Sequence, residues 1–125
     1  MSRDPWQLHV FCKADDLVAR IYETTKAFPV EERYGLHSQI RRAAVSVPAN
    51  IVEGSARWSP KDYLHLLNTA QGSAAEARYL IHLCGRLAYL SPQLREELWK
   101  GYDDVCRGLQ TVVTSIKRLE QENRS

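Results

Sequence analysis

The feature that most constrains this chain is a long row of apolar residues over 60–89. Their spacing alternates between four and three, which places them on one face of a helix. The row comprises Tyr63, Leu67, Ala70, Ala74, Ala77, Ile81, Cys84 and Ala88. Ser59 and Pro60 stand before it as an N-cap and a first-turn proline. A face this long has to be covered by other helices, so the spacing predicts a helical bundle.

Three further segments show helical periodicity, over 8–27, 33–57 and 92–120. Phe28-Pro29 ends the first of them, and Ser91-Pro92 opens the last. The last segment carries the row Leu98, Tyr102, Val105, Leu109, Val112, Ile116 and Leu119, and we expect 121–125 to fray. No stretch alternates with the period of two that is typical of a strand. We predict one all-α domain over 1–125, an antiparallel up-down-up-down four-helix bundle.

The segment 33–57 has apolar residues on two opposite faces. One face comprises Leu36, Ile40, Ala43, Val47, Ile51 and Gly54, and the other comprises Val45, Ala49, Val52 and Ala56. Pro48 lies inside the helical pattern and predicts a kink between Ala44 and Val47. A monomeric bundle has little use for the second face, so we favour self-association over a monomer.

The excess positive charge of the chain is concentrated in 33–61. This stretch has five basic residues and one carboxylate, Glu53, for a local net charge of +4. The basic residues are Arg33, Arg41, Arg42, Arg57 and Lys61. Arginine on a rigid helix suits contact with phosphates, which favours binding of nucleic acid. We expect no aromatic residues to accompany these basic ones, although sites for single strands usually have them. The alternative is structural: Arg42 and Arg57 would pair with Glu53, and Arg41 with a carboxylate of a neighbour.

Catalytic and metal sites are not indicated, and we expect no enzymatic activity and no cofactor. A di-iron bundle needs Glu-x-x-His pairs, but three positions before the four histidines only Asp62 is acidic. Cys84 and Cys106 fall on or beside apolar rows and are predicted to be buried and inert. Glu76 lies beside the apolar row of its helix, either paired with an arginine or solvated.

The composition favours a cytoplasmic protein. Hydrophobic residues make up 44% of the chain, and no apolar run approaches the roughly 18 residues that span a membrane. The N-terminal residues do not have the pattern of a secretory signal. Three widely spaced cysteines, Cys12, Cys84 and Cys106, are an odd number and fit reduced thiols.

Residues 8–90 resemble a known family, the four helix bundle proteins encoded by intervening sequences in bacterial 23S ribosomal RNA genes. The resemblance is carried by Tyr34-Gly35-Leu36, Ser38-Gln39-Ile40-Arg41-Arg42-Ala43-Ala44, Pro48-Ala49-Asn50-Ile51 and Glu53-Gly54. Phe11 and Cys12 stand where the family usually has Trp and Gln, and Ala74-Ala75 replaces a Leu followed by a polar residue. The fourth segment matches mainly in length and pattern.

The resemblance implies an antiparallel bundle that forms a homo-oligomer, typically a ring-like pentamer, with no established catalytic activity. It also implies a nucleic-acid role, which is inferred for the family from its genomic setting and basic surface. Distant relatives are accessory proteins to the reverse transcriptases of diversity-generating retroelements and bind nucleic acid and polymerase. The expected partners are therefore other copies of this chain, RNA or DNA, and a larger nucleic-acid-processing protein. The family motif falls on Ser38, Gln39, Arg41, Arg42, Asn50, Glu53 and Gly54. With the outer apolar face, Ser38, Gln39, Asn50, Glu53 and Gly54 form the predicted oligomer interface.

Overall fold

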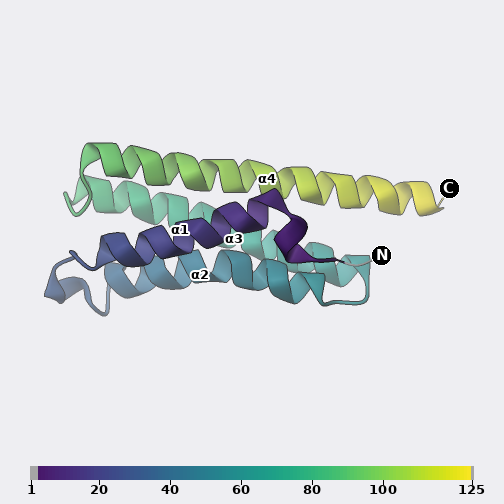
Figure 1. The fold of residues 1–125 in the computed structure, drawn as a ribbon, viewed down its shortest axis with the longest axis horizontal. Coiled ribbons are helices and arrows are strands. Elements are labelled where there is room, and N and C mark those ends of the chain that lie inside the picture. Colours follow the sequence, from purple (N-terminus) through teal and green to yellow (C-terminus); the bar gives the residue numbers. More distant parts are fainter. Residues whose placement is uncertain (1–2, 125) are drawn as a thin grey trace.

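The chain folds into four helices, and the computed structural model describes residues 3–124. The helices are α1 (His9–Thr25), α2 (Leu36–Ser55), α3 (Pro60–Arg86) and α4 (Pro92–Arg124), with short 3-10 turns η1 (Pro5–Gln7) and η2 (Val30–Glu32). No strand occurs among the described residues. Successive helices run in opposite directions, as Figure 1 shows. The predicted all-α four-helix bundle is confirmed.

The four helices form a closed ring of neighbours. α2 packs on α1 and α3, and α4 packs on α3 and α1, whereas the diagonal pairs do not approach each other. α1 is the shortest helix, with 17 residues against 33 in α4. The C-terminal part of α4 therefore reaches past the other helices (Figure 1).

The core follows the apolar rows of the sequence. All six residues of the inner α2 face are buried, and so are the first seven of the eight residues in the α3 row. In α1, the buried residues include Phe11 and Thr25. Thr25 is a polar core residue whose hydroxyl donates a hydrogen bond to the carbonyl of Ile21 at 2.8 Å.

The eighth residue of the α3 row, Ala88, does not belong to the helix. α3 ends at Arg86, and Ala88 is exposed with a φ of 63°, in the left-handed region. The backbone N–H of Tyr89 donates to the carbonyl of Cys84 at 2.9 Å, and that of Ala88 donates to Gly85 at 3.1 Å. These two bonds close the helix end in the manner of a Schellman motif, a position that glycine usually occupies.

The buried face of α4 changes its spacing after Leu109. Leu98, Tyr102, Val105 and Leu109 are buried as predicted, but the next buried residue is Val113 instead of Val112. Ile116 is half-buried and Leu119 is 50% exposed. Beyond this point α4 extends past α1, and fewer neighbours cover it. α4 continues to Arg124, beyond the predicted end at residue 120; Ser125 lies outside the described residues.

α2 runs without interruption through Pro48, which is buried. Its predicted span of 33–57 is longer than the observed helix because residues 30–35 form η2 and a turn. Glu32 from η2 caps α2: its Oε1 accepts a hydrogen bond from the backbone N–H of Leu36 at 3.1 Å. Its Oε2 accepts a second one from the Tyr89 hydroxyl at 2.9 Å. One carboxylate thus links the α1–α2 connection to the α3–α4 connection.

Candidate functional site

The five predicted nucleic-acid contacts do not gather at one place. Arg33, Arg41 and Arg42 lie around the start of α2, whereas Arg57 and Lys61 lie between the end of α2 and the start of α3. Arg42 and Arg57 are 15 residues apart along the chain, so about 22 Å of helix separates the two groups. The structure therefore divides the basic stretch into two clusters at opposite ends of α2.

The Arg41 side chain links α2 to α1. Its Nε donates to the Thr25 hydroxyl at 2.8 Å, and its Nη2 donates to the carbonyl oxygen of Tyr22 at 3.0 Å. Its guanidinium also lies 4.2 Å from the centre of the Tyr22 ring, a cation–π contact. The suggested pairing of Arg41 with a neighbouring carboxylate is therefore wrong within the protomer, since a hydroxyl, a carbonyl and a ring take its place.

Arg42 and Arg57 form ion pairs that remain open to solvent. Arg42 lies 2.8 Å from Glu76 on α3, and their side chains are 63% and 35% exposed. Arg57 lies 2.6 Å from Glu53 one turn earlier on α2, and both side chains are about half exposed. Glu76 is thus both paired and partly solvated, and Arg42 pairs with it instead of with Glu53. Exposed pairs of this kind contribute little stability, so each arginine can exchange its partner at small cost.

Arg33 and Lys61 have no such partner. Both side chains are exposed, and neither side chain forms a hydrogen bond or ion pair with any residue in the described range 3–124. Arg33 lies in the turn before α2, and Lys61 lies in the first turn of α3. Of the five basic side chains, these two therefore have the most donors available to a ligand.

A concave pocket of about 420 Å³ lies where α1 ends and α2 begins. Its lining consists of Tyr22, Arg33, Tyr34, His37, Ser38, Arg41 and Arg42. We refer to it as the tyrosine–arginine pocket. Its lining holds three guanidinium groups and no carboxylate, which makes its interior electropositive. Burial lowers the pKa of His37, and the nearby charges of Arg41 and Arg33 lower it further.

Three residues of this pocket were missed by sequence reasoning: Tyr22, Tyr34 and His37. Tyr34 is 89% exposed, and Tyr22 is 40% exposed. An available signal was the adjacent pair Arg33-Tyr34, which is matched by Arg57-Trp58 at the other end of α2. The expectation that aromatic residues do not accompany the basic ones is therefore wrong. Each end of α2 carries an arginine next to an exposed ring.

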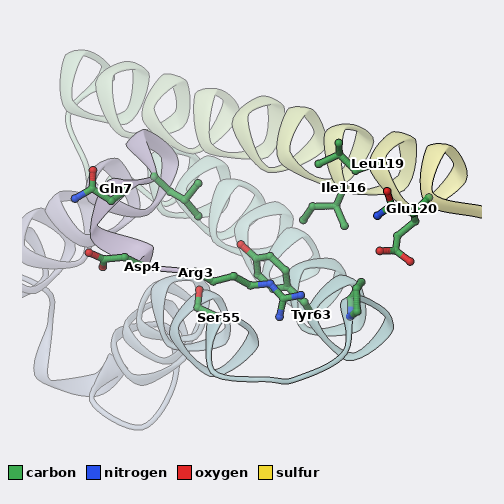
Figure 2. Close-up of a pocket in the computed structure, with 11 residues that line it drawn as sticks. Arg3, Asp4, Gln7, Ser55, Tyr63, Ile116, Leu119 and Glu120 are labelled. Atoms are coloured by element: carbon green, nitrogen blue, oxygen red, sulfur yellow. The ribbon is translucent and has the colours of Figure 1, made fainter. Parts of the chain in front are cut away.

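The other end of α2 is more apolar. Trp58 is 99% exposed beside Arg57 and lines a concavity with Arg3. Next to it is a groove of about 620 Å³, whose lining includes Ile116 and Leu119 of α4 and Tyr63 of α3 (Figure 2). Arg3 is fully engaged there: it donates to the Arg57 carbonyl at 2.6 Å and lies 4.7 Å from the centre of the Tyr63 ring.

The residues of the predicted oligomer interface fall on different sides of α2. Those of the outer apolar face, Val45, Ala49, Val52 and Ala56, are exposed, as are Ser38, Gln39 and Glu53. Gly54 is buried, and a Cβ placed there would lie 2.9 Å from the Tyr63 ring, so this glycine serves the α2–α3 contact. Asn50 is half-buried and donates to the carbonyl and the hydroxyl of Ser46. Gly54 therefore lies inside the protomer, at the contact between α2 and α3.

Metal and thiol chemistry find little support in the described part of the chain. No group of three His, Cys, Asp or Glu side chains is close enough there to hold a metal ion. Burial raises the pKa of the Cys84 thiol to about 11 and also raises that of Cys106. Thiols with a raised pKa are poor nucleophiles at neutral pH. None of the described helices is both long and apolar enough to cross a membrane.

Comparison with known proteins identifies the family. Residues 6–111 match the family described as 23S rRNA-intervening sequence protein. The chain belongs to this family. A crystal structure of a protein of unknown function from the S23 ribosomal protein family of Bacteroides thetaiotaomicron is similar, with a TM-score of 0.77 and 26% sequence identity. The alignment covers 83% of this chain and 97% of that one. No curated protein matches the sequence significantly.

Proposed function

We propose that this member of the 23S rRNA-intervening sequence family is a non-enzymatic homo-oligomer, favoured as a pentamer, that binds structured RNA or DNA. The observation that carries the proposal is the tyrosine–arginine pocket, which combines three guanidinium groups with two exposed rings and no carboxylate. Cations that neutralise phosphates and rings that stack on bases are the two usual components of nucleic-acid surfaces. A cytoplasmic location fits this role and the three free cysteines.

The contacts differ in their roles. Arg33 and Arg42 at one end of α2, and Arg57 and Lys61 at the other, are open to solvent and available to phosphates. Arg41 supports the pocket from within, because its N–H groups already bond to α1. Mutation of Arg41 would disturb packing and binding together, so Arg33 and Arg42 are the informative positions.

The test is the salt dependence of binding to an RNA hairpin, measured by fluorescence anisotropy. Affinity is expected to fall steeply between about 50 and 200 mM salt, because bound phosphates release counterions. Replacing both Arg33 and Arg42 by Ala should weaken binding and make the slope shallower by about 0.9 for each duplex phosphate that the variant no longer neutralises. Lys117→Ala, a change of an exposed cation on α4, serves as the control. No binding by the wild-type protein at the lower salt would overturn the proposal.

A second candidate function is a protein-interaction scaffold whose arginines hold subunits together. It is favoured by the outer apolar face of α2, where Val45 is 39% and Val52 is 45% exposed. On this alternative, Arg42→Ala should dissociate the oligomer in sedimentation velocity while the helix content by circular dichroism is retained. Full assembly of the variant would argue against it, and the pairing of Arg42 with Glu76 inside the protomer favours that result.

A further inference from the structure

The tyrosine–arginine pocket has the features of a site for one nucleotide whose base is not paired. Three arginines line it, and no carboxylate lies in the lining itself, although Arg42 also pairs with Glu76 of α3. Its volume of about 420 Å³ is within the range of small-ligand sites. A bound anion would offset the repulsion among these charges, so the pocket favours a phosphate-bearing ligand.

The guanidinium groups of the pocket are not equivalent. Arg41 is fixed by Thr25 and by the carbonyl and ring of Tyr22, so it supplies a stationary positive charge to the pocket lining. The Arg33 side chain is exposed and forms no hydrogen bond with the described residues. Arg42 uses its Nη2 for Glu76, and its side chain remains 63% exposed. Since a guanidinium has five N–H donors, Arg33 and Arg42 can both donate to phosphate oxygens.

The rings of the pocket also differ. One face of Tyr22 is occupied by the Arg41 guanidinium, whereas Tyr34 is 89% exposed. A tyrosine this exposed adds no stability by burial, but it offers a flat surface for stacking beside the phosphate-binding groups. Bases in a duplex are already stacked on each other, whereas bases in loops and at ends are free to stack on protein rings.

We propose that the tyrosine–arginine pocket binds one unpaired nucleotide of an RNA or DNA strand, with its phosphate against Arg33 and Arg42 and its base against Tyr34. The inference rests on the proposed nucleic-acid function and narrows it. The protein would recognise loops or ends of structured nucleic acid in preference to the middle of a duplex. This preference rests on three neighbouring side chains: Arg33, which has no partner among the described residues, Arg42, which keeps free donors beside its ion pair, and Tyr34, which is exposed.

The test compares two probes in RNA and DNA versions, a hairpin with an unpaired loop and the blunt duplex that repeats its stem. The full-length wild-type protein should bind the hairpin more tightly than the duplex. Tyr34→Ala should weaken hairpin binding about tenfold and leave duplex binding within about twofold of wild type. Tyr34→Phe keeps the ring and should restore hairpin affinity. Tyr79→Ala removes a tyrosine that is 58% exposed on α3, outside the pocket, and is the matched control.

The outcomes separate the two proposals. Equal affinity for hairpin and duplex, unchanged by Tyr34→Ala, would overturn the pocket assignment and leave the proposed function in place. Absence of binding to either probe at low salt would overturn the proposed function itself. Because Tyr34 is exposed and lies outside the helices, its replacement does not threaten folding.

A second readout locates the ligand. The His37 ring lines the pocket together with Arg33, Arg41 and Arg42, so its NMR titration reports the local charge. A phosphate bound beside the ring should raise the pKa of His37, since an anion favours the imidazolium form. A hairpin that binds without changing this pKa would occupy another surface, which would contradict the assignment.

Discussion

Glu32 shows how a single side chain positions the candidate site. Its carboxylate caps the first turn of α2 and accepts the Tyr89 hydroxyl from the α3–α4 connection. Arg33 and Tyr34 follow directly in the chain, so the cap also determines where these two side chains emerge. The acidic character of this connection was visible in the sequence, but its tie to Tyr89 was not, because the two residues are 57 positions apart.

Ala88 provides a stability prediction at the same scale. It occupies a left-handed conformation, which costs a residue with a Cβ about 1 kcal/mol compared with glycine. Ala88→Gly should therefore raise the free energy of unfolding by about 1 kcal/mol in urea denaturation. Ala75→Gly, in the exposed middle of α3, should lower it by a similar amount. Destabilisation by both changes would show that the left-handed conformation carries no penalty here.

Among the helices, the contact between α1 and α4 depends on two glycines. Gly101 of α4 packs against Leu17 of α1, and Gly108 packs against Val10. Both pairs of positions are seven residues apart on their helices. A Cβ at Gly108 would lie 2.9 Å from Val10 Cγ2 and 3.1 Å from its Cβ. Without a side chain at these two positions, α4 can lie closer to α1.

This geometry predicts opposite effects for two substitutions of the same type. Gly108→Ala should lower the free energy of unfolding by about 1–2 kcal/mol, because the new Cβ would crowd not only Val10 Cγ2 but also the Val10 Cβ, which no rotation of the side chain moves. A Cβ at Gly72 on α3 would have no atom within 4 Å. Gly72→Ala should therefore raise the free energy of unfolding by about 0.5–1 kcal/mol through helix propensity. Thermal and urea denaturation of the two variants measure both values; a stabilising Gly108→Ala would contradict the close contact.

The helices were largely predictable because their apolar spacing records which face is covered. The inner face of α2 and the row of α3 up to Cys84 were obtained in this way. The end of α3 was missed because an alanine in a left-handed conformation leaves no sequence signal. The main row of α4 was continued to Val112 instead of Val113 because a strict heptad was extended along a helix whose natural period is slightly longer.

At the scale of the whole molecule, the outer face of α2 is the surface left uncovered. Introducing a charge there should oppose association, because the charge would have to be buried at a subunit contact. Val45→Glu with Val52→Glu is expected to yield monomers in sedimentation velocity with unchanged helix content. Asn68→Glu, at an exposed position of α3, should leave assembly intact. A wild-type protein that sediments as a monomer would contradict the proposed oligomer.

The candidate site was predictable only in part. The sequence located the positive charge on and around α2, but it did not separate Arg41, which holds α1, from Arg33, which is free. That distinction depends on contacts with Tyr22 and Thr25, which belong to another helix. The pocket itself arises from the meeting of two helix ends, and periodicity within one helix does not describe such a meeting.

The double role of Arg41 links ligand binding to local opening of the protein. α1 is the shortest helix, and Arg41 joins its last turn to the wall of the pocket. Any fluctuation that detaches the end of α1 would also dismantle the site, so a bound nucleotide must suppress that fluctuation. Amide hydrogens in the last turns of α1 would then exchange with solvent more slowly when the pocket is filled. Hydrogen exchange in α1, the shortest helix, would therefore report most sensitively whether the tyrosine–arginine pocket is occupied.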